Sequence, residues 1–138
     1  GLKGGMNVSV ATPKAYQPDG TVLSFASAYG DKFSLTDDIH AAAAGADVVF
    51  TDVWASMGME GEAQQRRAAF TGYQVNDELL SVCARDVMVQ HCLPAHRGEE
   101  ITESVFEAHA NEIFDEAENR LHAQKAVMVK LMEKPPLF

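Results

Sequence analysis

Hydrophobic positions along the chain follow two alternating patterns. Short apolar runs rich in β-branched residues occur at 6–11, 32–35, 46–51 and 86–91, and each predicts a strand. Stretches with helical spacing lie between and after these runs, at 21–29, 36–45, 60–70, 76–84, 102–110 and 115–133. This alternation is typical of an α/β fold, a Rossmann-like three-layer domain with a mostly parallel sheet and helices on both faces.

The ends of the predicted helices have their own signals. Thr36 and Asn76 are suitable N-caps for the helices that follow them. Residues 113–114 form a short apolar run that we expect to be buried, just before the last and longest helix. That helix places Val127 and Leu131 on one apolar face.

Length and composition limit the possible functions. A chain of 138 residues is the size of one domain, and its net charge of -9 argues against a nucleic-acid partner. No apolar run is long enough to cross a membrane, and two cysteines are too few for a disulfide framework. We therefore expect a cytoplasmic protein, and because the chain starts with Gly1 we expect it to be a piece of a longer one.

The first candidate for chemistry is segment 52–58, which leaves a predicted buried strand. Ligands of parallel sheets bind beyond the carboxyl ends of strands. The Asp52 carboxylate could take the ammonium group of an amino acid, with a hydroxyl from Ser56 and a close backbone approach at Gly58. A strand-ending Asp that only caps a turn is an equally good interpretation of this motif alone.

The second candidate is His91-Cys92-Leu93-Pro94, which also follows a predicted strand. A His beside a Cys can polarise a carbonyl and move a proton, and Pro94 can fix an unusual peptide isomer. A buried thiol with a hydrogen-bonded core His is the more common arrangement. A metal held by His91, Cys92 and His96 is a weak alternative, because the spacing matches no common zinc pattern.

The third candidate is Arg120, near the start of the last helix. It could form an ordinary i,i+4 ion pair with Glu116, or direct its guanidinium to a phosphate or carbonyl oxygen in a cleft. The spacing alone favours the ion pair.

Taken together, the three segments are more specific than any one of them. Their order and spacing resemble ornithine carbamoyltransferases over essentially the whole chain, in the motifs Asp52-x-x-x-Ser56-Met57-Gly58, His91-Cys92-Leu93-Pro94 and Glu116-Ala117-Glu118-Asn119-Arg120. Cys92 and the Ser-Met-Gly loop separate these enzymes from the similar aspartate carbamoyltransferases.

The resemblance implies a role for each motif. Asp52 and Ser56 would hold the α-amino group of L-ornithine, and the backbone at Met57 its carboxylate. Cys92 and the carbonyl of Leu93 would lie near the reacting δ-amine. The catalytic residues would be His91, Cys92 and Arg120. His91 and Arg120 would contact the carbamoyl group of carbamoyl phosphate. The reaction would give citrulline and phosphate, in arginine biosynthesis or catabolism, and would need no metal or organic cofactor.

The resemblance also implies that residues 1–138 are only the second, ornithine-binding domain, incomplete at its N-terminus. The Ser-x-Arg-Thr phosphate motif of the family does not occur in this sequence. We therefore expect the carbamoyl-phosphate domain to be absent and the chain alone to be inactive. The complete enzyme would be a homotrimer.

Two other functions remain open at this stage. The chain could be a non-catalytic amino-acid-binding or interaction module that docks through its last helix. It could also serve a transcarbamylase for another amine, such as putrescine or acetylornithine. We expect Cys92 to be partly exposed and more readily alkylated than Cys83, which lies in an apolar helical run.

Overall fold

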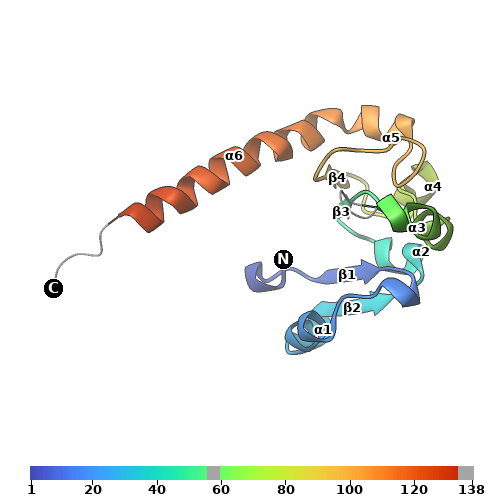
Figure 1. Cartoon of the computed structure of the whole chain (residues 1–138), viewed down its shortest axis with the longest axis horizontal. Coiled ribbons are helices and arrows are strands. Elements are labelled where there is room, and N and C mark those ends of the chain that lie inside the picture. Colours follow the sequence, from blue (N-terminus) through green and yellow to red (C-terminus); the bar gives the residue numbers. More distant parts are fainter. Residues whose placement is uncertain (56–59, 134–138) are drawn as a thin grey trace.

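The computed structural model describes residues 1–55 and 60–133, which form an α/β arrangement (Figure 1). Four strands were predicted, and four are present within this part of the chain: β1 (Val8–Ala11), β2 (Phe33–Thr36), β3 (Val48–Thr51) and β4 (Met88–His91). The helices are α1 (Gly20–Ser27), α2 (Ile39–Ala43), α3 (Ala63–Phe70), α4 (Asp77–Leu80), α5 (Glu103–Ala108) and α6 (Ala110–Met132). None of them combines the length and apolarity needed to cross a membrane.

The strands form two separate parallel pairs. β1 pairs with β2, with Val8 opposite Phe33, and β3 pairs with β4, with Val48 opposite Met88. We predicted a mostly parallel sheet, and every pairing between these strands is parallel. The prediction was of one sheet, whereas the described strands form two, β1 with β2 and β3 with β4.

Helix α2 begins later than the sequence suggests. Thr36 was predicted as its N-cap, but Thr36 belongs to β2, where its carbonyl accepts a hydrogen bond from the Thr12 N–H at 3.1 Å. The cap is Asp38, whose carboxylate accepts from the N–H groups of His40 and Ala41. The cap predicted at Asn76 is confirmed, since its side chain accepts from the Leu79 N–H.

Helix α6 begins earlier than the sequence suggests. The run 113–114 is its first turn rather than a separate element, because Ile113 is fully buried while Phe114 faces outward and meets Phe106 edge-on. The helix packs its first turns against β4 and α5. It then extends away from the rest of the chain, and each described residue from Ala117 onward is exposed (Figure 1).

One core joins the β3–β4 pair to the surrounding helices. Its buried members come from α2, α4, α5, the base of α6, β4 and two loop positions: Ala43, Val75, Leu79, Val89, Ile101, Val105, Phe106 and Ile113. Val75 and Ile101 also form an isolated parallel bridge, which links the loop before α4 to the loop before α5. This core fixes the strand ends at which the candidate motifs lie.

Replacing Ile113 tests whether the base of α6 belongs to this core. Its side chain has no exposed surface, so Ile113→Ala should lower the free energy of unfolding by about 2–5 kcal/mol. Leu131→Ala, on the same helix but 81% exposed, should change it by less than about 0.5 kcal/mol. Urea denaturation of both variants is the measurement, and equal effects would show that α6 does not anchor there.

Candidate functional site

The paired ends of β3 and β4 bring the first two candidate motifs together. Thr51 lies opposite His91 in the parallel register, so Asp52 and Cys92 leave the sheet side by side. The electrostatic influence of Asp52 on the Cys92 thiol agrees with this closeness. The expectation that both motifs lie at one edge of a parallel sheet is therefore met for these residues.

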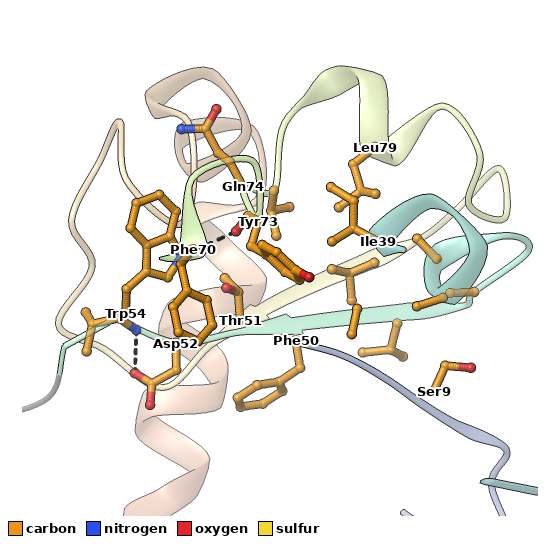
Figure 2. A pocket seen from close by; sticks show the side chains of 18 of the residues that line it. Ser9, Ile39, Phe50, Thr51, Asp52, Trp54, Phe70, Tyr73, Gln74 and Leu79 are labelled. Atoms are coloured by element: carbon orange, nitrogen blue, oxygen red, sulfur yellow. Dashed lines mark hydrogen bonds between the residues drawn. The ribbon is translucent and has the colours of Figure 1, made fainter. Parts of the chain in front are cut away.

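The Asp52 carboxylate remains available to a ligand. Its Oδ1 accepts a hydrogen bond from the Val53 N–H at 2.7 Å, and the residue is exposed (Figure 2). The turn-capping interpretation is therefore correct as far as it goes. The Cys92 thiol also interacts with this carboxylate. A carboxylate has acceptor capacity for about four hydrogen bonds, so these two contacts leave room for an ammonium group.

The Cys92 thiol is held in its protonated form. Burial, a hydrogen bond to Asp52 and the negative charge of Asp52 together raise its pKa to about 11, with a smaller effect from Glu116. Burial also raises the pKa of Cys83, which packs against the core. Both thiols are partly buried. The expectation of an easily alkylated Cys92 is opposed by this geometry, because the thiolate is the reactive form.

His91 lies below the surface in a fully bonded position. Its Nδ1 accepts from the Leu93 N–H at 2.9 Å, so its Nε2 carries the proton toward Oε1 of Glu100 at 3.0 Å. Neither His91 nor Glu100 has exposed surface. This geometry indicates that His91 holds the loop in place, and it argues against a direct contact between His91 and a carbamoyl group.

The loop after His91 has an unusual backbone. Leu93 adopts a φ of 53°, a left-handed conformation that is uncommon for a residue other than glycine, and its peptide bond to Pro94 is cis. The unusual isomer anticipated at Pro94 is thus present. Since the Leu93 N–H is bonded to His91, the buried imidazole holds the loop at the strained residue.

Helix α6 approaches the site at Glu116 and presents Arg120 one turn further on. Glu116 is half-buried and influences the Cys92 thiol, whereas Arg120 is exposed. Among the described ion pairs none joins these two residues, so the pair favoured by the spacing is not formed. The guanidinium therefore remains available for a ligand.

A cleft of about 400 Å³ opens along β3 and reaches the site at Asp52. At that end Trp54 stacks on Phe70, and the Trp54 indole N–H donates to the carbonyl of Tyr73 at 3.3 Å (Figure 2). Arg66 also lines this end and makes an ion pair with Glu62. Ser56 and Met57, predicted as ornithine ligands, lie outside the described residues.

Comparison with known proteins decides the family. The model for the aspartate/ornithine carbamoyltransferase Asp/Orn-binding domain matches residues 1–131. The chain belongs to this carbamoyltransferase family. A similar curated relative is the ornithine carbamoyltransferase of Methanosarcina acetivorans, 54% identical over 128 residues, which are 93% of this chain and 42% of the relative.

Solved carbamoyltransferases share the fold. The anabolic ornithine carbamoyltransferase of Campylobacter jejuni is 41% identical with a TM-score of 0.84, over 90% of this chain and 42% of that one. An N-acetyl-L-ornithine transcarbamylase is 31% identical with a TM-score of 0.75, over 92% and 40%. The Rossmann-like fold is therefore confirmed, and the chain spans less than half the length of these carbamoyltransferases.

Sequence reasoning missed Glu100, which supports the loop after His91. Its Oε1 accepts from both His91 and the His96 N–H, at 3.0 and 2.6 Å, while its Oε2 is buried without a described partner. The pair Glu99-Glu100 looks like two solvated charges in the sequence. Only the isolated bridge at Ile101, next in the chain, shows why Glu100 turns inward.

The metal site considered from the sequence is not assembled as proposed. His96 lies near Glu99 and Glu100 instead, with one ligand atom of each within 4.8 Å of the others. Glu99 already pairs with Arg67 at 2.9 Å, and Oε1 of Glu100 is already bonded to His91. The described cluster is better explained as a hydrogen-bond network that supports the loop after His91.

The alkylation rate of Cys92 tests its protonation state. In a Cys83→Ala background, the rate with iodoacetamide should rise about tenfold per pH unit from pH 7 to 10, because the pKa is about 11. Asp52→Asn removes a nearby negative charge, which lowers this pKa and should raise the rate at pH 8 several-fold. Asp47→Asn, at the other end of β3, is the control. A plateau near pH 8.5, the ordinary cysteine pKa, would contradict the assignment.

Substitution of Glu100 tests the buried network. Glu100→Ala removes the acceptor of the buried His91 imidazole and of the partly buried His96 N–H, and should lower the free energy of unfolding by about 3–5 kcal/mol. Glu100→Gln should cost less, because the amide oxygen still accepts from both donors. Glu99→Ala removes only a surface ion pair, worth about 1 kcal/mol or less. Equal losses from Glu99→Ala and Glu100→Ala in urea denaturation would contradict the network.

Proposed function

We propose that this chain is the ornithine-binding part of an ornithine carbamoyltransferase. The observation that carries the proposal is the side-by-side position of Asp52 and Cys92 at the carboxyl ends of β3 and β4. The neutral δ-amine of L-ornithine attacks the carbamoyl carbon of carbamoyl phosphate. A carbon–nitrogen bond forms, the bond to the phosphate oxygen breaks, and the nitrogen loses a proton, giving citrulline and phosphate.

Each residue at the cleft has a distinct part in this proposal. The exposed Asp52 carboxylate accepts a charge-assisted hydrogen bond from the α-ammonium group of L-ornithine, and Ser56 binds the same group. The backbone at Met57 binds the α-carboxylate of L-ornithine. The Cys92 thiol, protonated at neutral pH, contacts the δ-amine without competing as a nucleophile. The carbonyl of Leu93 accepts from the same amine.

Orientation and charge stabilisation supply the catalysis. Arg120 directs its guanidinium to the carbamoyl oxygen, where negative charge develops. His91 acts as a positioning residue, since it is buried and holds Leu93 through a 2.9 Å hydrogen bond. The reaction as proposed uses no metal and no organic cofactor.

The complete enzyme has further parts in this proposal. The carbamoyl-phosphate domain lies outside residues 1–138, and the absence of a Ser-x-Arg-Thr motif from this sequence supports that division. The apolar side chains of α6, of which Leu131 and Met132 are 81% exposed, pack against that domain. We place the assembled enzyme in the cytoplasm as a homotrimer.

Binding of L-ornithine tests the proposal directly. Titration followed by amide chemical shifts should show saturable binding that perturbs residues beside Asp52 and Cys92. Asp52→Asn removes a hydrogen bond between charged groups and should weaken binding at least tenfold. Asp47→Asn, which alters a carboxylate at the opposite end of β3, should leave it unchanged. Equal weakening by both variants would contradict a site at Asp52.

The acceptor is tested by comparing ligands on the same chain. N-acetylornithine lacks the α-ammonium group and putrescine lacks the α-carboxylate, so both should bind more weakly than L-ornithine. Tighter binding of either would assign the chain to a transcarbamylase for that amine. The isolated chain should form no citrulline from both substrates, and turnover near that of a complete relative would contradict the division into two domains.

A further inference from the structure

The connection between α3 and α4 is bonded to both loops of the candidate site. On one side, the Tyr73 carbonyl accepts the hydrogen bond from the Trp54 indole at 3.3 Å, two residues beyond Asp52 (Figure 2). On the other side, the next residue, Gln74, is bonded to the loop that follows β4. Gln74 is half-buried, and the reaction proposed above gives it no part.

The Gln74 side chain makes two hydrogen bonds to that loop. Its Nε2 donates to the carbonyl of Gly98 at 3.0 Å and to the carbonyl of Glu99 at 2.8 Å. The next carbonyl, that of Glu100, accepts from the Val75 N–H at 2.8 Å. Two adjacent residues therefore hold three successive carbonyls of the loop. The side-chain amide suits this task because its NH2 group carries two donor hydrogens.

The segment held by Gln74 is connected to the backbone at Leu93. Oε1 of Glu100 is bonded to Nε2 of His91 at 3.0 Å, and Nδ1 of His91 accepts from the Leu93 N–H at 2.9 Å. The left-handed conformation of Leu93 is one that persists where its surroundings hold it. A displacement of Glu100 is therefore passed to Leu93 through two hydrogen bonds.

A second contact between α3 and this loop is a weaker constraint. Arg67 pairs with the Glu99 carboxylate at 2.9 Å, but the Arg67 side chain is 54% exposed. Exposed ion pairs of this kind add little stability, because water and salt screen them. Gln74 instead bonds to the backbone of the loop, and it does so next to the buried bridge between Val75 and Ile101.

We propose that Gln74 is a positioning residue for the amine end of the amino-acid substrate. By fixing residues 98–100 it sets, through Glu100 and His91, where the Leu93 carbonyl meets the δ-amine. The inference rests on the proposed function, which places Leu93 at that amine. The loop at Asp52 is bonded to Tyr73 through Trp54 instead, so Gln74 acts on one end of the substrate and leaves the α-ammonium end unchanged.

Two ligands that differ in the δ-amine test this role. L-norvaline has the α-ammonium and α-carboxylate groups of L-ornithine and lacks the δ-amine. Gln74→Met keeps the length of the side chain and removes its donors, so it should weaken L-ornithine binding about fivefold and change L-norvaline binding less than about twofold. Gln65→Met, on the exposed surface of α3, is the matched control and should change neither. Equal weakening of both ligands by Gln74→Met would indicate general support of the fold and overturn the proposal.

Hydrogen exchange without ligand tests the connection to Leu93. In Gln74→Met the Leu93 amide should exchange about tenfold faster, while the Val53 amide, bonded to Asp52, should be unchanged. Gln74→Asn keeps the amide but shortens its reach by one methylene, and it should give the same pattern if Gln74→Met does not fold. Unchanged Leu93 exchange in a folded variant would overturn the proposal.

The unsubstituted chain separates this inference from the proposed function. A chain that does not bind L-ornithine would contradict the proposed function and, with it, the substrate role of Gln74. Normal L-ornithine binding by Gln74→Met would contradict this inference alone.

Discussion

The parallel pairing of β3 with β4 is the constraint on which the candidate site depends. The two strands are separated by 36 positions, from Thr51 to Met88, counting the residues between them, and their register sets which residues meet at the sheet edge. A shift of one residue would exchange the faces of every side chain on the strand. Val89, buried on one face of β4, fixes that register through the core, and with it the meeting of Asp52 and Cys92.

The polar residues at this edge of the sheet differ in charge state and hydrogen bonding according to how deeply they are buried. Asp52 is exposed and keeps free acceptor capacity, while one step inward Cys92 is held as a neutral thiol. Deeper still, His91 and Glu100 have no exposed surface, and the imidazole Nε2 is bonded to Oε1 of the carboxylate. The residue with the most obvious catalytic chemistry in the sequence therefore serves the architecture of the loop, and the groups nearer the surface are the ones that can meet a substrate.

The sequence predicted much of this fold because its local signals agree with its tertiary contacts. The four strands lie where β-branched runs place them, and Asn76 caps α4 as expected. The cap predicted at Thr36 was wrong because the Thr36 backbone is bonded to the chain at the end of β1, where Ala11 lies opposite it. That pairing joins residues distant in the sequence, so local signals do not reveal it. The division of the sheet has the same origin, since no local pattern reports which strands become neighbours.

The candidate site shows a similar limit. The motifs containing Asp52 and Cys92 could be found from strand ends, because ligands gather there in parallel sheets. Glu100 could not, since an acidic pair in a polar loop ordinarily faces water and only the Val75–Ile101 bridge turns it inward. Arg120 lies on the predicted helix, but the ion pair expected between Glu116 and Arg120 is not formed among the described residues. Glu116 lies close enough to Cys92 to influence its thiol instead.

The projection of α6 has a consequence for how cooperatively the chain unfolds. Its 23 residues are anchored at one end by Ile113, and from Ala117 to Met132 every residue is exposed in the described part of the chain. Most helix stability in proteins comes from tertiary packing, and the exposed part of α6 gains little from the core that secures β4. The distal turns of α6 therefore form a separate unit of low local stability, whose opening precedes global unfolding and leaves the strand pairs intact.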